Sequence, residues 1–169
     1  METMLSTVGI QEDFDIMSIE KVRSFFRSYG MEDRILEFAE SSATVELAAH
    51  AAGCEPARIA KTLSFDLAGE PILVVTAGDM RIAGAKFKAV FHGKPRMLSA
   101  DMVENAIGHG VGGVCPFAVN ARVKVYLDIS LKRFDTVFPA CGSGNSAIEL
   151  TPEEMEKYSG AVGWVDVCK

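Results

Sequence analysis

A lysine within an otherwise apolar run is the first residue of this sequence whose position suggests chemistry. Lys61 lies in the segment Ile59–Phe65, whose other residues suit a buried β-strand. An ammonium group there needs an anionic or carbonyl partner, because an unpaired buried charge is costly. One interpretation is that Lys61 holds a phosphate or carbonyl oxygen of a ligand. The alternative is a lysine at a strand edge whose ammonium reaches water.

The second candidate is a glycine-rich loop, Gly108–Phe117, which has four glycines among its first six residues. Glycines let backbone N–H groups approach a ligand closely, so that such a loop could bind an oxyanion or a carbonyl oxygen. The spacing matches neither a Walker A loop nor a dinucleotide-binding fingerprint. The alternative is a tight connection into the next strand, which needs no ligand.

Two other segments allow more than one interpretation. Cys115 could act as a nucleophile with His109 as its base, but the sequence indicates no third group that would orient them. A buried, inert cysteine is the alternative. The later segment Cys141–Ser146 has the glycines and asparagine of a hairpin turn, and it could also form one wall of a pocket.

A local cluster of positive charge stands against an acidic total. The net charge is −6, from 17 basic and 23 acidic residues, whereas a general nucleic-acid-binding protein would be basic. The stretch from residue 81 to residue 96 nevertheless contains no acid and five basic residues. These five are Arg81, Lys86, Lys88, Lys94 and Arg96. We expect them to bind RNA phosphates, and the alternative is a solvated helix face.

Composition predicts a single domain without metal. A chain of 169 residues suits one core, and we assign residues 18–169 to it and residues 1–17 to an N-terminal extension. The four cysteines are far apart and form no C-x-x-C pair, which argues against a zinc site or a disulfide framework and favours the cytoplasm. No apolar run reaches the roughly 18 residues of a membrane span, so no membrane partner is expected.

The elements that must position these residues are short and mixed. Apolar spacing and capping residues predict helices over 18–29, 44–50, 81–91 and 99–107, and from Thr151 onward. Strand character is found over 34–38, 61–67, 72–76, 123–129 and 164–167. Since a hairpin at 68–71 joins two strands directly, we expect a mixed sheet with helices packed against it.

Four motifs in order give the sequence a family resemblance. They are TVELAA at Thr44–Ala49, IAKTL at Ile59–Leu63, VGGVCPF at Val111–Phe117, and a late glycine-rich turn at Gly142–Ser146 with the strand after it. In order and spacing they resemble the YbaK/prolyl-tRNA-synthetase-associated editing family over about residues 18–167. The resemblance implies an α+β fold with a mixed, strongly curved, barrel-like sheet and helices around it.

The resemblance also implies an activity. Members hydrolyse the ester that joins a wrong amino acid to transfer RNA, and this chain resembles the free-standing kind, acting on a proline-type transfer RNA without metal or cofactor. The expected partners are the acceptor end of mischarged transfer RNA and a prolyl-tRNA synthetase, with the protein a monomer or a homodimer.

Site residues are carried over by position. Lys61 resembles the family's lysine at the substrate end of the RNA, while Gly112 and Gly113 resemble backbone donors beside the scissile ester. The resemblance implies a reaction that uses a positioned water and the substrate's own ribose hydroxyl. The residues expected to bind substrate around them are Phe38, Thr44, Thr62, His109, Val111, Pro116, Phe117, Gly142, Ser143 and Asn145.

One departure from the family leaves a rival hypothesis open. Some members have an aspartate or a histidine near the late glycine-rich turn, where this chain has Asn145, Ser146 and Ala147. The rival is a binding module that keeps the pocket without the chemistry, and binds RNA ends or a free amino acid.

Overall fold

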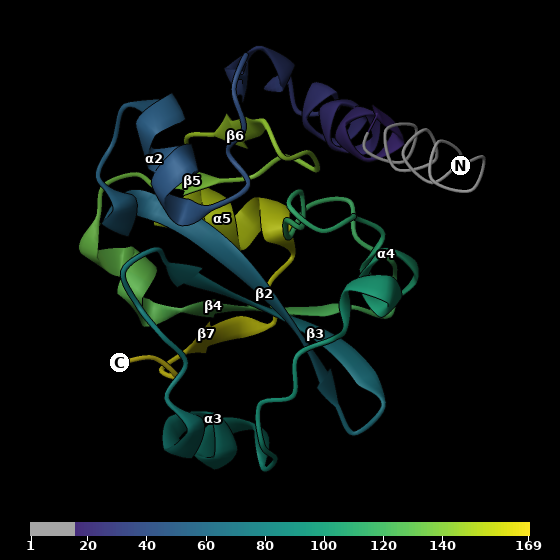
Figure 1. Ribbon diagram of the computed structural model, residues 1–169, viewed down its shortest axis with the longest axis vertical. Coiled ribbons are helices and arrows are strands. Elements are labelled where there is room, and N and C mark those ends of the chain that lie inside the picture. Colours follow the sequence, from purple (N-terminus) through teal and green to yellow (C-terminus); the bar gives the residue numbers. More distant parts are fainter. Residues whose placement is uncertain (1–15) are drawn as a thin grey trace, which may run out of the picture.

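A curved five-stranded sheet forms the centre of the protein, whose computed structural model describes residues 16–169 (Figure 1). The strand order is β5-β2-β3-β4-β7. Only β2 and β3 run antiparallel as neighbours, and the other three pairs are parallel. The expected mixed, strongly curved sheet is therefore confirmed. Its strands are β2 (Ile59–Leu67), β3 (Glu70–Ala77), β4 (Lys124–Asp128), β5 (Phe138–Pro139) and β7 (Gly163–Val165).

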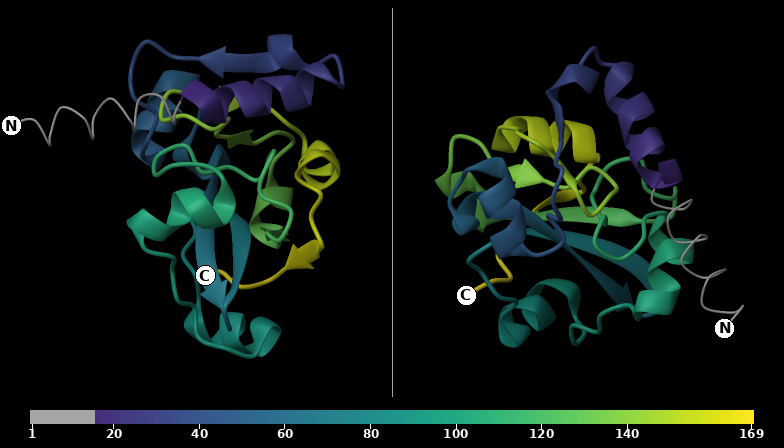
Figure 2. Two further views of the ribbon diagram at one scale, coloured as in Figure 1. Left: turned by 90° about the vertical axis from the view of Figure 1, so that its right-hand side faces the viewer. Right: turned by 45° about the horizontal axis from the view of Figure 1, so that its top comes forward.

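Helices and a small second sheet surround this centre. Strands β1 (Ile35–Glu37) and β6 (Ser146–Ile148) pair antiparallel. In both views of Figure 2, β1 and the helical segment 16–27 lie at one end of the molecule and α3 at the other. The helices are α2 (Val45–Ala52), α3 (Gly84–Phe91), α4 (Ala100–Ile107) and α5 (Pro152–Ser159), with short 3-10 turns η1 (Glu32–Arg34), η2 (Pro56–Arg58) and η3 (Ile129–Arg133).

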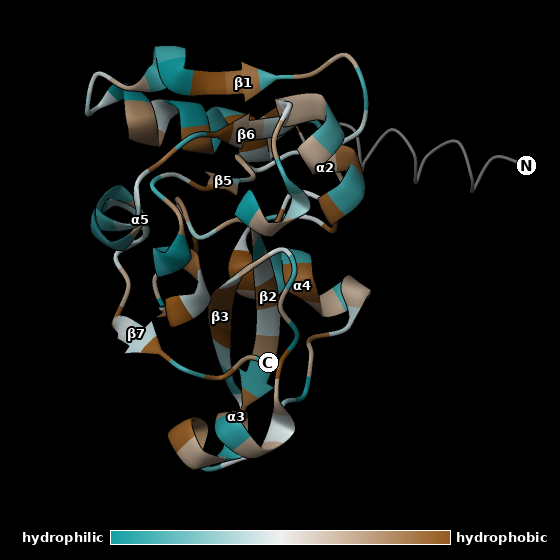
Figure 3. Ribbon diagram, turned by 90° about the vertical axis from the view of Figure 1, so that its left-hand side faces the viewer, coloured by the Kyte–Doolittle hydropathy of each residue, from teal (hydrophilic) through white to brown (hydrophobic). Residues whose placement is uncertain are grey.

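Strand β3 is buried on both faces and divides the core. Figure 3 shows it in the colours of apolar residues. Because successive side chains of a strand point to opposite faces, Leu73 and Val75 join the larger cluster, which includes Phe117. Ile72 and Val74 join a second cluster beneath α3. Burial of both faces explains why this run is almost wholly apolar.

Most predicted helix starts are confirmed. The Thr44 hydroxyl accepts a hydrogen bond from the Leu47 amide at the start of α2, and Thr151 forms a capping box with Glu154 at the start of α5. The prediction for Ser99 was wrong in one respect, because this residue precedes α4 without a side-chain cap.

Two predicted helix boundaries were wrong. The helix expected over 81–91 begins only at Gly84, because Arg81 and Ala83 pair with the extended C-terminal segment: the Ala83 amide donates to the Val167 carbonyl at 2.8 Å. Ser18 does not cap the first helix, since residues 16 and 17 are already helical and Ser18 is buried within it. Of the extension assigned to residues 1–17, residues 1–15 lie outside the described part of the chain.

Candidate active site

One edge of β2 is left without a strand partner in its middle. Strand β5 pairs only with Ile59 and Ala60. Further along, the Leu98 amide donates to the Ser64 carbonyl at 3.1 Å, so a different segment covers the edge there. Between these two contacts the residues 61–63 face a cavity of about 410 Å³, which we call the edge cavity. Unpaired main-chain groups at such an edge can bind a ligand.

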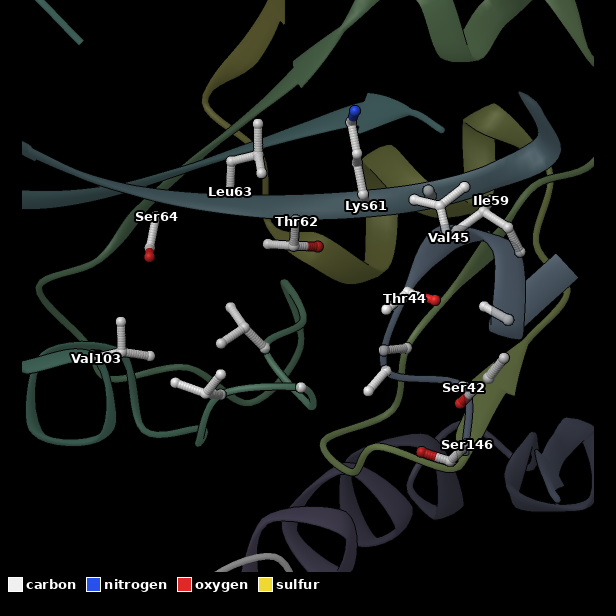
Figure 4. Close-up of a pocket in the computed structure, with 18 of the residues that line it drawn as sticks. Ser42, Thr44, Val45, Ile59, Lys61, Thr62, Leu63, Ser64, Val103 and Ser146 are labelled. Atoms are coloured by element: carbon white, nitrogen blue, oxygen red, sulfur yellow. The ribbon is translucent and has the colours of Figure 1, made fainter. Parts of the chain in front are cut away.

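The lining of the edge cavity is mostly small and apolar, with a few hydroxyls. Among the described residues that line it, Lys61 alone has a titratable side chain. Alanine and valine side chains from α2, α4 and the glycine loop form much of the wall (Figure 4). A space of this size and character suits a small, uncharged group. The lining hydroxyls belong to Ser42, Thr44, Thr62, Ser64 and Ser146.

Thr62 is the most unusual of these residues. Its Oγ1 atom is buried and has no hydrogen-bond partner among residues 16–169, and Figure 4 shows the side chain pointing toward the cavity on the same side of β2 as Ser64. The outer hydrogen bonds of β2 are made by Ser64 and Asp66, and the strand repeats every two residues. The amide and carbonyl of Thr62 therefore point to the open edge as well.

Lys61 lies on the other face of the strand. In Figure 4 its side chain points away from Thr62 and Ser64, and its ammonium donates to the Met80 carbonyl. Lys61 lines the same cavity as Gly112, but its side chain leaves β2 on the face opposite to that of Thr62. The reason is the strand period of two, which places neighbouring side chains on opposite faces.

The two glycines of the loop have different roles. Gly112 lines the edge cavity with a φ of +90°, and its amide donates to no acceptor among residues 16–169. The Gly113 amide, in contrast, donates to the Gly110 carbonyl at 3.1 Å. A Cβ on Gly113 would lie 2.5 Å from the Gly142 carbonyl oxygen. Gly113 therefore allows two loops to pack closely, and of the two glycines only Gly112 both lines the cavity and has an amide without an acceptor among residues 16–169.

His109 is part of the core and does not line the cavity. It is fully buried, and its Nε2 lies 2.6 Å from the Phe117 carbonyl oxygen. That contact requires the proton on Nε2, so Nδ1 accepts the hydrogen bond from the Ser18 hydroxyl. Burial lowers the pKa of His109 to about 4, so the ring is neutral near pH 7. The histidine thus connects the glycine loop to the helix 16–27.

Cys115 has the surroundings of an inert thiol. Its Sγ lies 3.4 Å from the His109 Nε2, but the proton on that nitrogen is directed to the Phe117 carbonyl. Burial of the thiol raises its pKa to about 12, whereas nucleophilic cysteines have a lowered pKa. The site therefore gives no support to a cysteine nucleophile.

Several residues expected to bind substrate make hydrogen bonds within and between the surrounding loops. The Phe38 amide donates to the Asn145 carbonyl at 2.8 Å, and the Asn145 side-chain amide donates to the Phe38 carbonyl at 3.1 Å. Ser143 donates to its neighbour Ser146 at 2.8 Å. Of the ten predicted residues, Thr44, Thr62 and Val111 line the edge cavity. The seven that do not are Phe38, His109, Pro116, Phe117, Gly142, Ser143 and Asn145.

The five basic residues expected to bind RNA are all exposed. Lys86 donates to Asp166 at 3.0 Å and to the Cys168 carbonyl at 2.9 Å, so its charge is partly neutralised. The Arg81 main chain pairs with Lys169 at the C-terminus. Lys94 and Arg96 lie together at another hollow of the surface.

Sequence comparison places the chain in a family. Residues 39–158 match the family model of the aminoacyl-tRNA editing domain, and the chain therefore belongs to this family. It is 52% identical over 154 residues to the uncharacterized protein YwhH of Bacillus subtilis (strain 168), covering 90% of this chain and 98% of YwhH. It is 26% identical to the proline–tRNA ligase of Lysinibacillus sphaericus (strain C3-41), covering 87% of this chain and only 27% of that ligase.

A solved structure shows the same fold. It is described as that of a candidate trans-editing enzyme for prolyl tRNA synthetase, and it superposes with a TM-score of 0.81 at 27% identity. The match covers 90% of this chain and 97% of the other. Within residues 16–169, no cluster of potential metal ligands occurs. No helix of that region has the length and apolar character needed to cross a membrane.

Proposed function

We propose that this protein is an aminoacyl-tRNA deacylase that acts in trans on a mischarged, proline-type transfer RNA. Its family is that of aminoacyl-tRNA editing domains. The proline–tRNA ligase relative and the description of the structural relative both support proline transfer RNA as the partner.

The observation that carries the proposal is the meeting of Thr62 and Gly112 at the edge cavity. The Gly112 amide, which has no acceptor among residues 16–169, can donate to the carbonyl oxygen of an ester, where negative charge develops during hydrolysis. The Thr62 carbonyl, at the open strand edge, can accept a hydrogen bond from the substrate's α-ammonium group. A small, uncharged amino-acid side chain would occupy the apolar remainder of the cavity.

The chemistry requires only water as a second reactant. Water oxygen bonds to the ester carbon while the bond from that carbon to the ribose oxygen breaks. One proton of the water passes to the ribose oxygen and the other to solvent, so that the amino acid leaves as its carboxylate. Since neither Cys115 nor His109 can act as nucleophile or base in this geometry, the cavity contributes by orienting the ester and stabilising its oxyanion.

A panel of substrates tests the proposal. Proline transfer RNA is charged separately with alanine, serine, cysteine and proline, and release of each amino acid is followed with and without the protein. We expect release of at least one non-cognate amino acid far above the spontaneous rate. Spontaneous rates throughout the panel would overturn the proposal.

A second candidate, a binding module without turnover, is favoured by one observation. Ala147 lines the edge cavity and offers no acid or imidazole there. The same panel distinguishes the two: the module would bind the acceptor end and slow spontaneous hydrolysis, whereas the deacylase accelerates it.

A further inference from the structure

A second hollow lies close to the edge cavity. It has a volume of about 360 Å³ and is formed where the β2–β3 hairpin meets the end of α3. We call it the basic hollow, and it is lined by residues 66–69, residues 91–94 and Arg96. It shares no lining residue with the edge cavity.

The charge of the basic hollow is positive and largely uncompensated. Lys94 and Arg96 are exposed, and within residues 16–169 neither forms a salt bridge. The lining contains one carboxylate, Asp66, whose Oδ1 already accepts a hydrogen bond from the Gly69 amide at 2.8 Å. Two unpaired cations around a concave surface suit a phosphate group.

His92 adds a donor at a strained position. It ends α3 with a φ of +60°, in the left-handed region where glycine is favoured, and its side chain is exposed at the hollow. A non-glycine residue there is costly, and such strain concentrates at functional sites. The imidazole can donate a hydrogen bond to an anionic oxygen beside Lys94 and Arg96.

A single extended segment connects the hollow to the edge cavity. Arg96 pairs with Asp66, its carbonyl accepting from the Asp66 amide at 2.8 Å, and Leu98 pairs with Ser64. Arg96 therefore borders the basic hollow, while the next residue, Met97, borders the edge cavity and is 59% exposed. A chain whose terminal group enters the cavity would pass Met97 and bring its preceding phosphates to Arg96.

We propose that the basic hollow binds phosphodiester groups of the single-stranded RNA end whose last nucleotide enters the edge cavity. The inference rests on the proposed function. Lys94 and Arg96 pair with the phosphates, and His92 donates to one of their oxygens. Lys86, which is bonded to Asp166, lies outside the hollow and takes no part.

The test compares two double variants that lose the same charge. K94A/R96A removes both cations of the hollow. The control K132A/K157A removes two other exposed lysines, one on η3 and one on α5. Helix α5 lies away from α3, toward the other end of the molecule, in Figures 1 and 2. Each protein is assayed on mischarged transfer RNA and on the same amino acid esterified to adenosine, which has no phosphate.

We expect K94A/R96A to raise KM for the transfer RNA by about tenfold or more, with kcat and the adenosine ester unaffected. For a single-stranded RNA oligonucleotide that carries no amino acid, the slope of log binding constant against log salt concentration should become shallower by about 1.4. This corresponds to two phosphate contacts at about 0.7 each. An unchanged KM and slope, or equal losses in the control, would overturn the inference. If wild type hydrolyses neither ester, the proposed function fails, and the oligonucleotide titration alone decides whether the hollow binds RNA.

Discussion

Thr62 and Lys61 are neighbours in sequence, yet they face opposite sides of β2. The hydroxyl of Thr62 is buried and has no partner among residues 16–169, which is uncommon because buried polar atoms are nearly always hydrogen-bonded. The ammonium of Lys61 already has a partner in the Met80 carbonyl. Among residues 16–169, the Thr62 hydroxyl and the Gly112 amide therefore have no hydrogen-bond partner, whereas the Lys61 ammonium has one.

Replacement of Thr62 by valine separates function from stability. T62V keeps the shape of the side chain and removes the unsatisfied hydroxyl, so the free energy of unfolding should stay the same or rise by about 1 kcal/mol. We expect kcat/KM for deacylation to fall by about tenfold, since an oriented polar group is lost. The control T62S keeps the hydroxyl and should retain most of the activity. Full activity in T62V would remove the hydroxyl from the account.

The variant K61A tests whether the Lys61 ammonium moves into the cavity when substrate binds. Its long, flexible side chain can reach the other side of the strand edge if the bond to the Met80 carbonyl breaks. We expect K61A to slow single-turnover deacylation by on the order of a hundredfold, as for loss of a positioning or oxyanion-stabilising group. Normal turnover in K61A would limit the lysine to holding β2 against Met80.

Among the elements, the glycine loop depends on the helix 16–27 for its position. His109 connects the two through the Ser18 hydroxyl and the Phe117 carbonyl. The close approach of Gly113 to Gly142 fixes the loop from another direction. These contacts hold Gly112 at the cavity.

This connection predicts a pH dependence of stability. The pKa of His109 is lowered from 6.5 to about 4 in the folded protein, so the unfolded chain binds the proton more readily. The contribution of neutral His109 to the free energy of unfolding is therefore complete above about pH 6.5 and is lost as the pH falls toward 4. Urea unfolding across this range should show wild type losing up to about 3 kcal/mol more than H109Q. Parallel curves for the two proteins would contradict this, because all carboxylates are common to both.

The sequence predicts individual strands and helix caps better than it predicts which distant segments pair with one another. Capping at Thr44 and Thr151 depends on residues within one turn, so it can be read from the chain. The open edge of β2 depends on where the residues 96–98 and the short β5 pair with it, which no local pattern indicates. For the same reason the motif VGGVCPF marks the right loop, but it does not tell that Gly112 faces the cavity while Phe117 enters the core.

At the scale of the whole molecule, the sheet edge, the glycine loop, α2 and α4 enclose one cavity, and the basic hollow lies next to it. The acidic total of −6 opposes unspecific binding of nucleic acid, since repulsion acts wherever the surface is not locally basic. On the proposed function, the protein would bind mainly the end of an RNA, because the basic hollow and the edge cavity act together there.

The most direct test is single-turnover release of the amino acid from mischarged proline transfer RNA, with A43L measured beside wild type. Ala43 is exposed, lines the edge cavity and lies near Gly112, so a leucine there should fill the cavity and leave the fold intact. We predict rapid release by wild type and near-spontaneous release by A43L, with matching unfolding curves. Equal release rates for the two proteins would contradict hydrolysis in this cavity.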